Sequence, residues 1–280
     1  MTETAADKVG AVDSHTHLLP ERLASKIRAF FDEHLGGQLA YPDIDPTAVL
    51  DRHHADGVAM VWTLPYAHKA GMAAQLNVDI AALAAGLGDH PVEVIPGATA
   101  HPDDPDPGGD VARALAAGAG VVKLHCSVGD YVATDPRLDG VWAAAAEAGV
   151  PVVVHAGHNV SGNTDGGEVV EVARAAERHP DTIVIVAHTG HPATDVTIEW
   201  MDRLPNLWAD LTPVVTDPVT VSDEALDRLA DRFLFGSDAP NTGVDVATLL
   251  AGLATRKLRS EAIAGIMGGN ARRLTPSRRN

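Results

Sequence analysis

The feature that most constrains this chain is a series of eight short apolar runs, rich in Val, Ile and Leu, that recur along its 280 residues. Most of these runs lack polar alternation, which is typical of parallel strands covered on both faces. Eight strands that alternate with helices predict a (β/α)8 TIM barrel, whereas a doubly wound open sheet usually has fewer strands. The predicted strands are residues 11–15, 57–63, 92–98, 120–125, 151–155, 182–188, 207–211 and 232–238.

The segments between these runs have helical spacing and Ala-rich faces. Several of them end on Gly or Pro, where helices tend to stop. The segment HTHLLPER after the first strand lacks the glycine-rich phosphate turn of a Rossmann sheet. No linker, low-complexity tract or internal repeat divides the chain. We therefore expect residues 1–280 to form a single α/β barrel domain.

Composition narrows the class of protein. The chain has 21 basic against 38 acidic residues, a net charge of −17, and a hydrophobic content of 45%. Nucleic acid and anionic membrane surfaces are therefore not expected as partners. No apolar stretch approaches the roughly 20 residues that a bilayer span needs, and the N-terminus lacks the pattern of a signal peptide. We expect a cytoplasmic protein.

Metal-ligand residue types stand at the ends of several predicted strands. They occur in VDSHTH, VVVHAG, IVAHTG and LFGSDAP, and each follows directly on an apolar run. The single cysteine, Cys126, excludes an intramolecular disulfide and a cysteine-based zinc cage, so His and carboxylate groups must hold any metal. The candidate ligands are His15, His17, His155, His188 and Asp238.

Strand parity indicates where these side chains point. Residues two apart on a strand share a face, so His15 and His17 point the same way. The same rule pairs His155 with Val153, His188 with Val186, and Asp238 with Gly236. If each set points inward, all five ligands converge at the C-terminal ends of the strands, where barrel enzymes keep their active sites. Such a set suits zinc, which takes three or four N and O ligands in catalytic sites.

Several blocks of this sequence resemble the signatures of the amidohydrolase superfamily. They are VDSHTH, VVVHAG, IVIVAHTG, RFLFGSDAP and the terminal GNARRL. The resemblance is strongest to its branch of compact amidohydrolase-related proteins, which holds hydrolases and aminocarboxymuconate semialdehyde decarboxylase-like enzymes. It runs from Val12 to Leu274.

The resemblance implies roles for the candidate ligands. It implies that His15, His17 and Asp238 contact one divalent metal, most often zinc, with manganese and cobalt as alternatives. Asp238 would also take a proton from the attacking water and deliver it to the leaving group. His155 would bind the same metal or a second one. His188 would bind a second metal or, with a single metal, polarise the substrate and move protons.

Lys123 and its neighbours decide how many metals the site holds. In binuclear members of the superfamily, a lysine on strand four is carboxylated and bridges two metals. By parity Lys123 shares the inward face with His125, which is a candidate substrate contact, whereas Cys126 points away. An unmodified Lys123 that pairs with a substrate carboxylate, or merely extends along an apolar surface, stays open as the alternative.

The loops at the same mouth are expected to frame a pocket for a small-molecule substrate. Because the chain has only four Phe, three Tyr and four Trp, we expect a pocket for a small or polar substrate rather than an extensively aromatic one. Relatives are often homodimers, and the sequence leaves the oligomeric state open. The candidate substrate contacts in these loops are Tyr66, His68, His158 and His191.

The sequence favours a metal-dependent hydrolase that attacks an amide, ester or lactone bond with a metal-activated water. One alternative is a metal-dependent non-oxidative decarboxylase of a small carboxylic acid, which shares almost every motif. Another is a barrel that binds a ligand without catalysis. Catalytic roles are predicted for Asp238 and His188.

Overall fold

The computed structural model describes residues 10–35, 39–158 and 166–275. Its eight strands form one parallel sheet in sequence order, with each strand paired to the next. The predicted TIM barrel is confirmed. The strands are β1 (Ala11–Thr16), β2 (Val58–Thr63), β3 (Glu93–Thr99), β4 (Val121–Leu124), β5 (Val152–Val154), β6 (Val184–Val186), β7 (Leu207–Asp210) and β8 (Phe233–Leu234).

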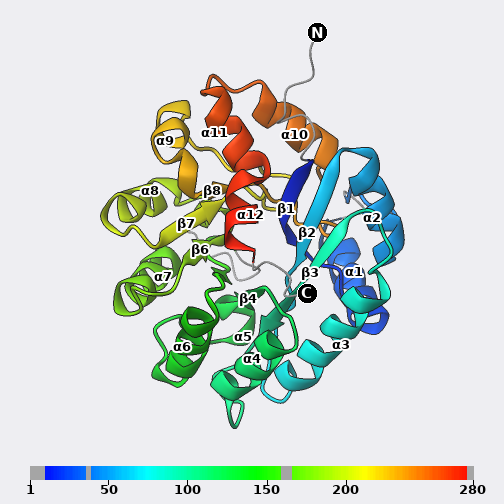
Figure 1. Cartoon of the computed structure of the whole chain (residues 1–280), viewed down its shortest axis with the longest axis vertical. Coiled ribbons are helices and arrows are strands. Elements are labelled where there is room, and N and C mark those ends of the chain that lie inside the picture. Colours follow the sequence, from blue (N-terminus) through cyan, green and yellow to red (C-terminus); the bar gives the residue numbers. More distant parts are fainter. Residues whose placement is uncertain (1–9, 36–38, 159–165, 276–280) are drawn as a thin grey trace.

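Helices surround the ring of strands, and α12 lies across the ring (Figure 1). They bury their apolar faces against the outward-pointing residues of the strands. The helices are α1 (Glu21–Leu35), α2 (Pro46–Ala55), α3 (Ala73–Gly86), α4 (Pro107–Ala116), α5 (Cys126–Gly129), α6 (Asp139–Ala148), α7 (Gly167–Arg178), α8 (Thr194–Arg203), α9 (Asp223–Arg228), α10 (Val246–Ala254), α11 (Ser260–Ala264) and α12 (Asn270–Leu274).

Four helices begin at side-chain caps. Asp45, Asp106, Ser222 and Asp245 each accept a hydrogen bond from the backbone N–H three residues later. Such a cap satisfies one of the N–H groups that the first helical turn leaves without a partner. These caps define where α2, α4, α9 and α10 begin. Among the described residues, no helix is both long and apolar enough to span a bilayer.

An apolar cluster fills the barrel and closes its N-terminal end. Inward-facing residues such as Val12, Trp62 and Val153 are buried in it. Ala271 and Leu274 of α12 belong to the same cluster, so this helix plugs the barrel at the N-terminal ends of the strands. The GNARRL block therefore packs against the barrel.

The first and last strands meet at a seam. The Asp238 N–H donates to the His15 carbonyl at 2.8 Å, and the His17 N–H donates to the Ala239 carbonyl at 2.7 Å. A parallel bridge joins Thr16 to Ala239 beyond the end of β8. Because these bonds lie at the C-terminal ends of β1 and β8, they bring residues that are more than 200 positions apart in sequence to the mouth of the barrel.

Candidate metal centre at the barrel mouth

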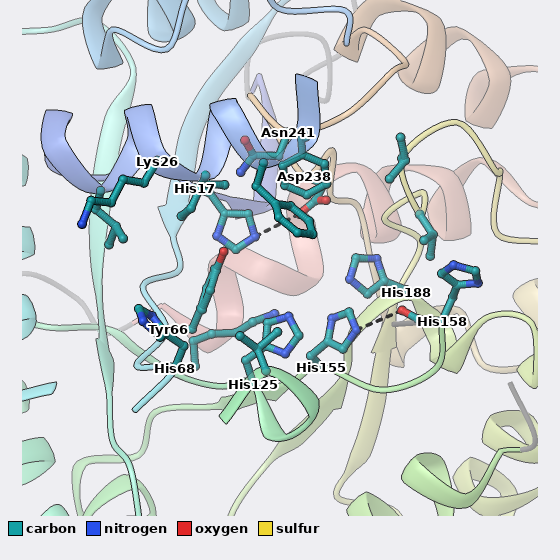
Figure 2. Close-up of a pocket in the computed structure, with 18 residues that line it drawn as sticks. His17, Lys26, Tyr66, His68, His125, His155, His158, His188, Asp238 and Asn241 are labelled. Atoms are coloured by element: carbon teal, nitrogen blue, oxygen red, sulfur yellow. Dashed lines mark hydrogen bonds and ion pairs between the residues drawn. The ribbon is translucent and has the colours of Figure 1, made fainter. Parts of the chain in front are cut away.

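Three of the predicted ligands converge at the seam. The ligand atoms of His15, His17 and Asp238 all lie within 4.8 Å of one another. His17 Nε2 is 2.9 Å from Asp238 Oδ1, and His15 Nε2 is 3.6 Å from the same oxygen. Figure 2 shows His17 and Asp238 directed toward each other across the top of the pocket. Register shifts in the pairing of β1 with β2 accompany the turn of both histidines into the barrel.

The hydrogen bonds of the two histidines leave one lone pair of each aimed at this point. His17 Nδ1 donates to the Leu64 carbonyl at 2.7 Å, and His15 Nδ1 donates to Asp210 Oδ2 at 2.9 Å. In a neutral imidazole the other nitrogen, Nε2, then carries a lone pair. Two Nε2 lone pairs and the Asp238 carboxylate therefore face one another, an arrangement that a bound cation would stabilise.

Asp210 belongs to the candidate site, and the sequence analysis missed it. It ends β7 and is buried, and besides His15 it accepts from the His188 N–H at 2.8 Å and the Thr212 N–H at 3.2 Å. Burial raises the pKa of Asp210, but the hydrogen bond from the His15 ring outweighs burial and holds the pKa far below its usual range. Its position at the end of an apolar run is the signal that marked the other site residues.

Lys123 lies beside the three ligands and is fully buried. Its Nζ is 3.1 Å from His15 Nε2, so an ammonium already sits next to the cluster of acceptor atoms. Burial lowers the pKa of Lys123 to about 8, although Asp210 and Asp238 act in the opposite direction. Burial and the Lys123 charge together lower the pKa of His15 to about 3, which keeps that imidazole neutral. The predicted inward orientation of Lys123 agrees with this position.

His125, His155 and His188 form a second group next to the first. The rings of His125 and His155 are stacked with centroids 3.9 Å apart, and the His155 and His188 centroids are 4.9 Å apart. His188 is also 5.0 Å from His15, measured between centroids. Burial lowers the pKa of all three histidines, so neutral imidazoles line this side of the pocket.

The parity argument holds for β5 and fails for β6. Val153 faces the barrel interior, and His155 follows it on that face as predicted. On β6, Ile185 and Ala187 face inward, whereas Val186 packs in the outer cluster. The pairing of His188 with Val186 was therefore wrong.

His188 reaches the site because the chain turns there. A 3-10 turn over Ala187–Gly190 holds His188 at φ 56° and Thr189 at φ 48°. Asp238 has a similar backbone, with φ 66°. Such left-handed residues cost roughly 1–3 kcal/mol each and cluster at functional sites. Two predicted site residues are thus aimed by strained backbone rather than by strand alternation.

A buried network behind the seam holds the strands that carry the ligands. Asp13 Oδ1 accepts from the backbone N–H of Ser237 at 3.0 Å and of His15 at 3.2 Å. Asp13 Oδ2 accepts from the Ser237 hydroxyl and lies 2.9 Å from His53 Nε2 of α2. Both Asp13 and His53 are fully buried. This network ties β1, α2 and the segment after β8 together directly beneath His15 and Asp238.

A cavity of about 570 Å³ opens above the candidate ligands. Tyr66, His68, His125 and His158 line it as predicted (Figure 2). His191 is not among the described residues that line it. Its backbone carbonyl instead accepts from the His158 N–H at 2.7 Å.

One wall of the cavity is apolar, which differs from the expectation of a pocket for a polar substrate. Helix α1 contributes apolar side chains, and Phe30 and Phe31 account for two of the four phenylalanines in the chain. The remaining apolar lining comes from α5 and from the segment after β7. The apolar lining residues are Leu23, Ile27, Phe30, Phe31, Val128, Val214 and Val215.

Comparison with known families identifies the chain. The family model described as Amidohydrolase matches residues 12–276, which is nearly the whole sequence. The chain belongs to the amidohydrolase family. No curated protein sequence matches this amidohydrolase.

Solved structures share the barrel of this amidohydrolase. An uncharacterised TIM-barrel protein of Bordetella bronchiseptica is 21% identical with a TM-score of 0.73, and the match covers 94% of this chain and 97% of that one. The 5-carboxyvanillate decarboxylase of Sphingomonas paucimobilis is 14% identical with a TM-score of 0.68, over 96% and 99% of the two chains. At these identities the likeness shows the fold.

A third solved structure carries a metal. A dihydroxybenzoic acid decarboxylase of Polaromonas, with bound manganese and the inhibitor 2-nitroresorcinol, is 16% identical with a TM-score of 0.67. The match covers 95% of this amidohydrolase and 96% of that chain.

Proposed function

We propose that this amidohydrolase is a metal-dependent hydrolase of an amide, ester or lactone bond in a small molecule. The observation that carries the proposal is the convergence of His15, His17 and Asp238 within 4.8 Å at the mouth of a cavity. A cytoplasmic location stays a prediction from the sequence.

The donor set fits a divalent cation. Imidazole and carboxylate ligands suit zinc, and manganese or cobalt are alternatives. The hydrogen bonds from His15 to Asp210 and from His17 to Leu64 are the kind of support that orients metal-bound histidines. When bound, the metal would polarise the substrate carbonyl and make a water acidic enough to attack near neutral pH.

Asp238 is the residue best suited to handle the proton. It is the sole acid among the described residues that line the cavity, and its side chain is 13% exposed, so substrate and water can reach it. Burial raises the pKa of Asp238, but the His17 ring, 2.9 Å from Oδ1, outweighs burial and lowers that pKa overall, so the carboxyl is ionised. We assign Asp238 as the general base that accepts a proton from water at Oδ2 or Oδ1 and returns it to the leaving group.

His188 is the second proton-handling residue in this proposal. Its Nδ1 donates to the Thr212 carbonyl at 3.2 Å, which leaves the Nε2 lone pair for the cavity side. With one metal, His188 would hydrogen-bond the reacting substrate. With two, it would join His155 as a ligand, and carboxylation of Lys123 would convert the buried ammonium into an anionic bridge.

Decarboxylation is the second candidate, and a specific observation favours it. Two of the solved structures that share the fold over nearly the whole chain are aromatic acid decarboxylases, one of them with bound manganese. The phenylalanines in the pocket wall would accommodate an aromatic ring. In this reaction, Asp238 or His188 would first take a proton from water and then deliver it to the carbon that loses carbon dioxide.

Two measurements test the proposal together. Elemental analysis of the purified protein should find a divalent metal, and about two ions per chain would favour hydrolysis with a carboxylated Lys123. A panel of esters, lactones and amides is then compared with a panel of aromatic acids assayed for carbon dioxide release. Turnover of the aromatic acids without turnover of the esters, lactones and amides would establish the decarboxylase. Protein that takes up no metal would favour a non-catalytic barrel.

A further inference from the structure

The charges around the cavity are opposite in sign to those of the chain as a whole. The chain carries a net charge of −17, yet among the described residues that line the cavity Asp238 is the single acid. Two of the five lysines in the sequence, Lys26 and Lys123, line it together with six histidines. The two ammonium groups outnumber the one carboxylate, so this concave site has a positive potential that attracts anions.

Lys26 and His68 form the outer part of this basic lining. Lys26 projects from α1 and is exposed, and His68 follows β2. Neither side chain makes a hydrogen bond or ion pair with a described residue. Burial, followed by the positive charges of Lys69 and Lys26, lowers the pKa of His68, which indicates that both ammonium groups act on this imidazole. The two side chains thus offer unused donors at the rim.

These donors stand apart from the reacting centre. Figure 2 shows Lys26 and His68 on one side of the pocket and His188 and His158 on the other. His17 lies between the two sides, and its ring is 5.5 Å from that of Tyr66, measured between centroids. A ligand that reaches from Asp238 to Lys26 would therefore cross the pocket.

An apolar surface connects the two ends. Leu23, Ile27 and Phe30 repeat at spacings of four and three residues along α1, on the face that lines the cavity. Lys26 lies within the same turns, so its ammonium stands at the edge of this apolar strip. A helix that presents an apolar strip beside a lysine matches a ligand with an apolar body and an anionic end.

We propose that the substrate is an amphiphilic anion: an apolar or aromatic body packed on Leu23, Ile27 and Phe30, with a carboxylate that pairs with Lys26 and His68 at the rim while the scissile carbonyl lies at Asp238. This inference rests on the proposed function for the identity of the reacting group, but the recognition of the anionic end does not depend on which bond is broken. Lys26 is a specificity-determining residue in this arrangement.

Binding of two nearly isosteric probes tests the inference without turnover. Calorimetric titration of the zinc-loaded protein compares 4-phenylbutyrate with 4-phenylbutyramide, which share the apolar body and differ in charge. We expect the carboxylate to bind about tenfold more tightly, the usual size of one charge-assisted hydrogen bond. The preference should shrink as ionic strength rises, because the Lys26 end is exposed.

Variants separate the rim from the metal as the source of the preference. Lys26→Met should reduce the ratio of the two dissociation constants to about twofold or less, whereas Lys26→Arg should retain most of it. Ile27→Ser should weaken both probes and leave their ratio unchanged, because it alters only the apolar strip. Lys257→Met is the matched control, since Lys257 is exposed and does not line the cavity.

Each outcome decides the inference. Equal affinities in the wild type overturn it, and so does a preference that persists in Lys26→Met, because the carboxylate would then be recognised at the metal. If the Lys26-dependent preference holds while no ester, lactone or amide with an anionic end is turned over, the substrate class stands and the proposed hydrolase activity fails.

Discussion

The two ends of this barrel are built from the same strands, but they differ in polarity and in the regularity of the backbone. At the N-terminal end, apolar residues of the strands and of α12 fill the interior. At the C-terminal end, the same strands continue into histidines, Lys123, Asp210 and Asp238, buried next to a cavity. The regular end stabilises the fold, and the irregular end holds strained backbone and desolvated charges that the stable end must support.

Substitution of Asp238 should produce the largest effect, which is a loss of activity without a loss of stability. We expect Asp238→Asn to lower kcat about 10³-fold or more, because the amide cannot accept the proton of the attacking water. The melting temperature should stay close to that of the wild type. The measurement is turnover of the best substrate from the ester and lactone panel, with a thermal melt alongside. Retained turnover would refute the role assigned to Asp238.

A substitution in α12 should have the opposite effect: it should lower stability and leave activity intact. Leu274→Ala removes a side chain that is 8% exposed in the inner apolar cluster, and should cost about 3 kcal/mol of unfolding free energy. Denaturant unfolding measures this loss, and the activity per folded molecule should be unchanged. Val128→Ala, at the half-buried mouth, is the matched control and should cost far less. Similar losses of unfolding free energy in the two variants would contradict the view that the N-terminal end stabilises the fold.

Asp210 shares features of both ends of the barrel. It is a buried strand residue, and it orients the proposed ligand His15. Asp210→Asn should weaken metal binding about 30-fold, within the range seen when a histidine loses its supporting carboxylate. Competition with a chromophoric chelator gives the affinity. Asp202→Asn, which alters an exposed ion pair with Arg228, should leave the affinity unchanged. An unchanged affinity in the Asp210 variant would show that the His15 tautomer does not need this partner.

The remaining prediction is a pH dependence of stability to which the buried histidines of the mouth contribute. His15 and His155 have pKa values lowered by burial, so the unfolded chain binds protons below its pKa near 6.5 while the folded protein does not. Stability of the metal-free protein should therefore fall as the pH drops from 6.5 toward 3, by about 1.4 kcal/mol per pH unit for each such histidine.

Removing one of these groups sharpens that prediction. His155→Gln should reduce the slope of unfolding free energy against pH by about 1.4 kcal/mol per pH unit over this interval, which corresponds to one proton. Unfolding of chelator-treated protein in urea at several pH values measures it. A slope that is the same in both proteins would mean that His155 titrates normally in the folded state.

The sequence predicted the regular end better than the irregular one. All eight strands fall where the apolar runs predicted them, because continuous burial leaves a strong signal. Parity also predicted the inward orientation of Lys123 and His155, which follow regular strands. The prediction of the site failed where the regular strand β6 ends, because an apolar period does not encode the left-handed turn at His188.

Two further parts of the site needed the three-dimensional structure. Asp210 has the same strand-end position as the predicted ligands, but its partner His15 is 195 residues away in sequence. Helix α1 packs with α3 through Ala24, Leu76 and Ile80, and its apolar strip lines the cavity. A count of aromatic residues cannot tell that Phe30 and Phe31 gather at one site. Residues that act in pairs across the fold are therefore the ones that composition and periodicity do not reveal.

The seam between β1 and β8 has a consequence for how the protein is made. The ribosome synthesises His15 and His17 first, and Asp238 follows more than 200 residues later. These three proposed ligands cannot meet on a nascent chain until the eighth strand has emerged and closed against the first. Capture of a metal by them would therefore depend on closure of the barrel.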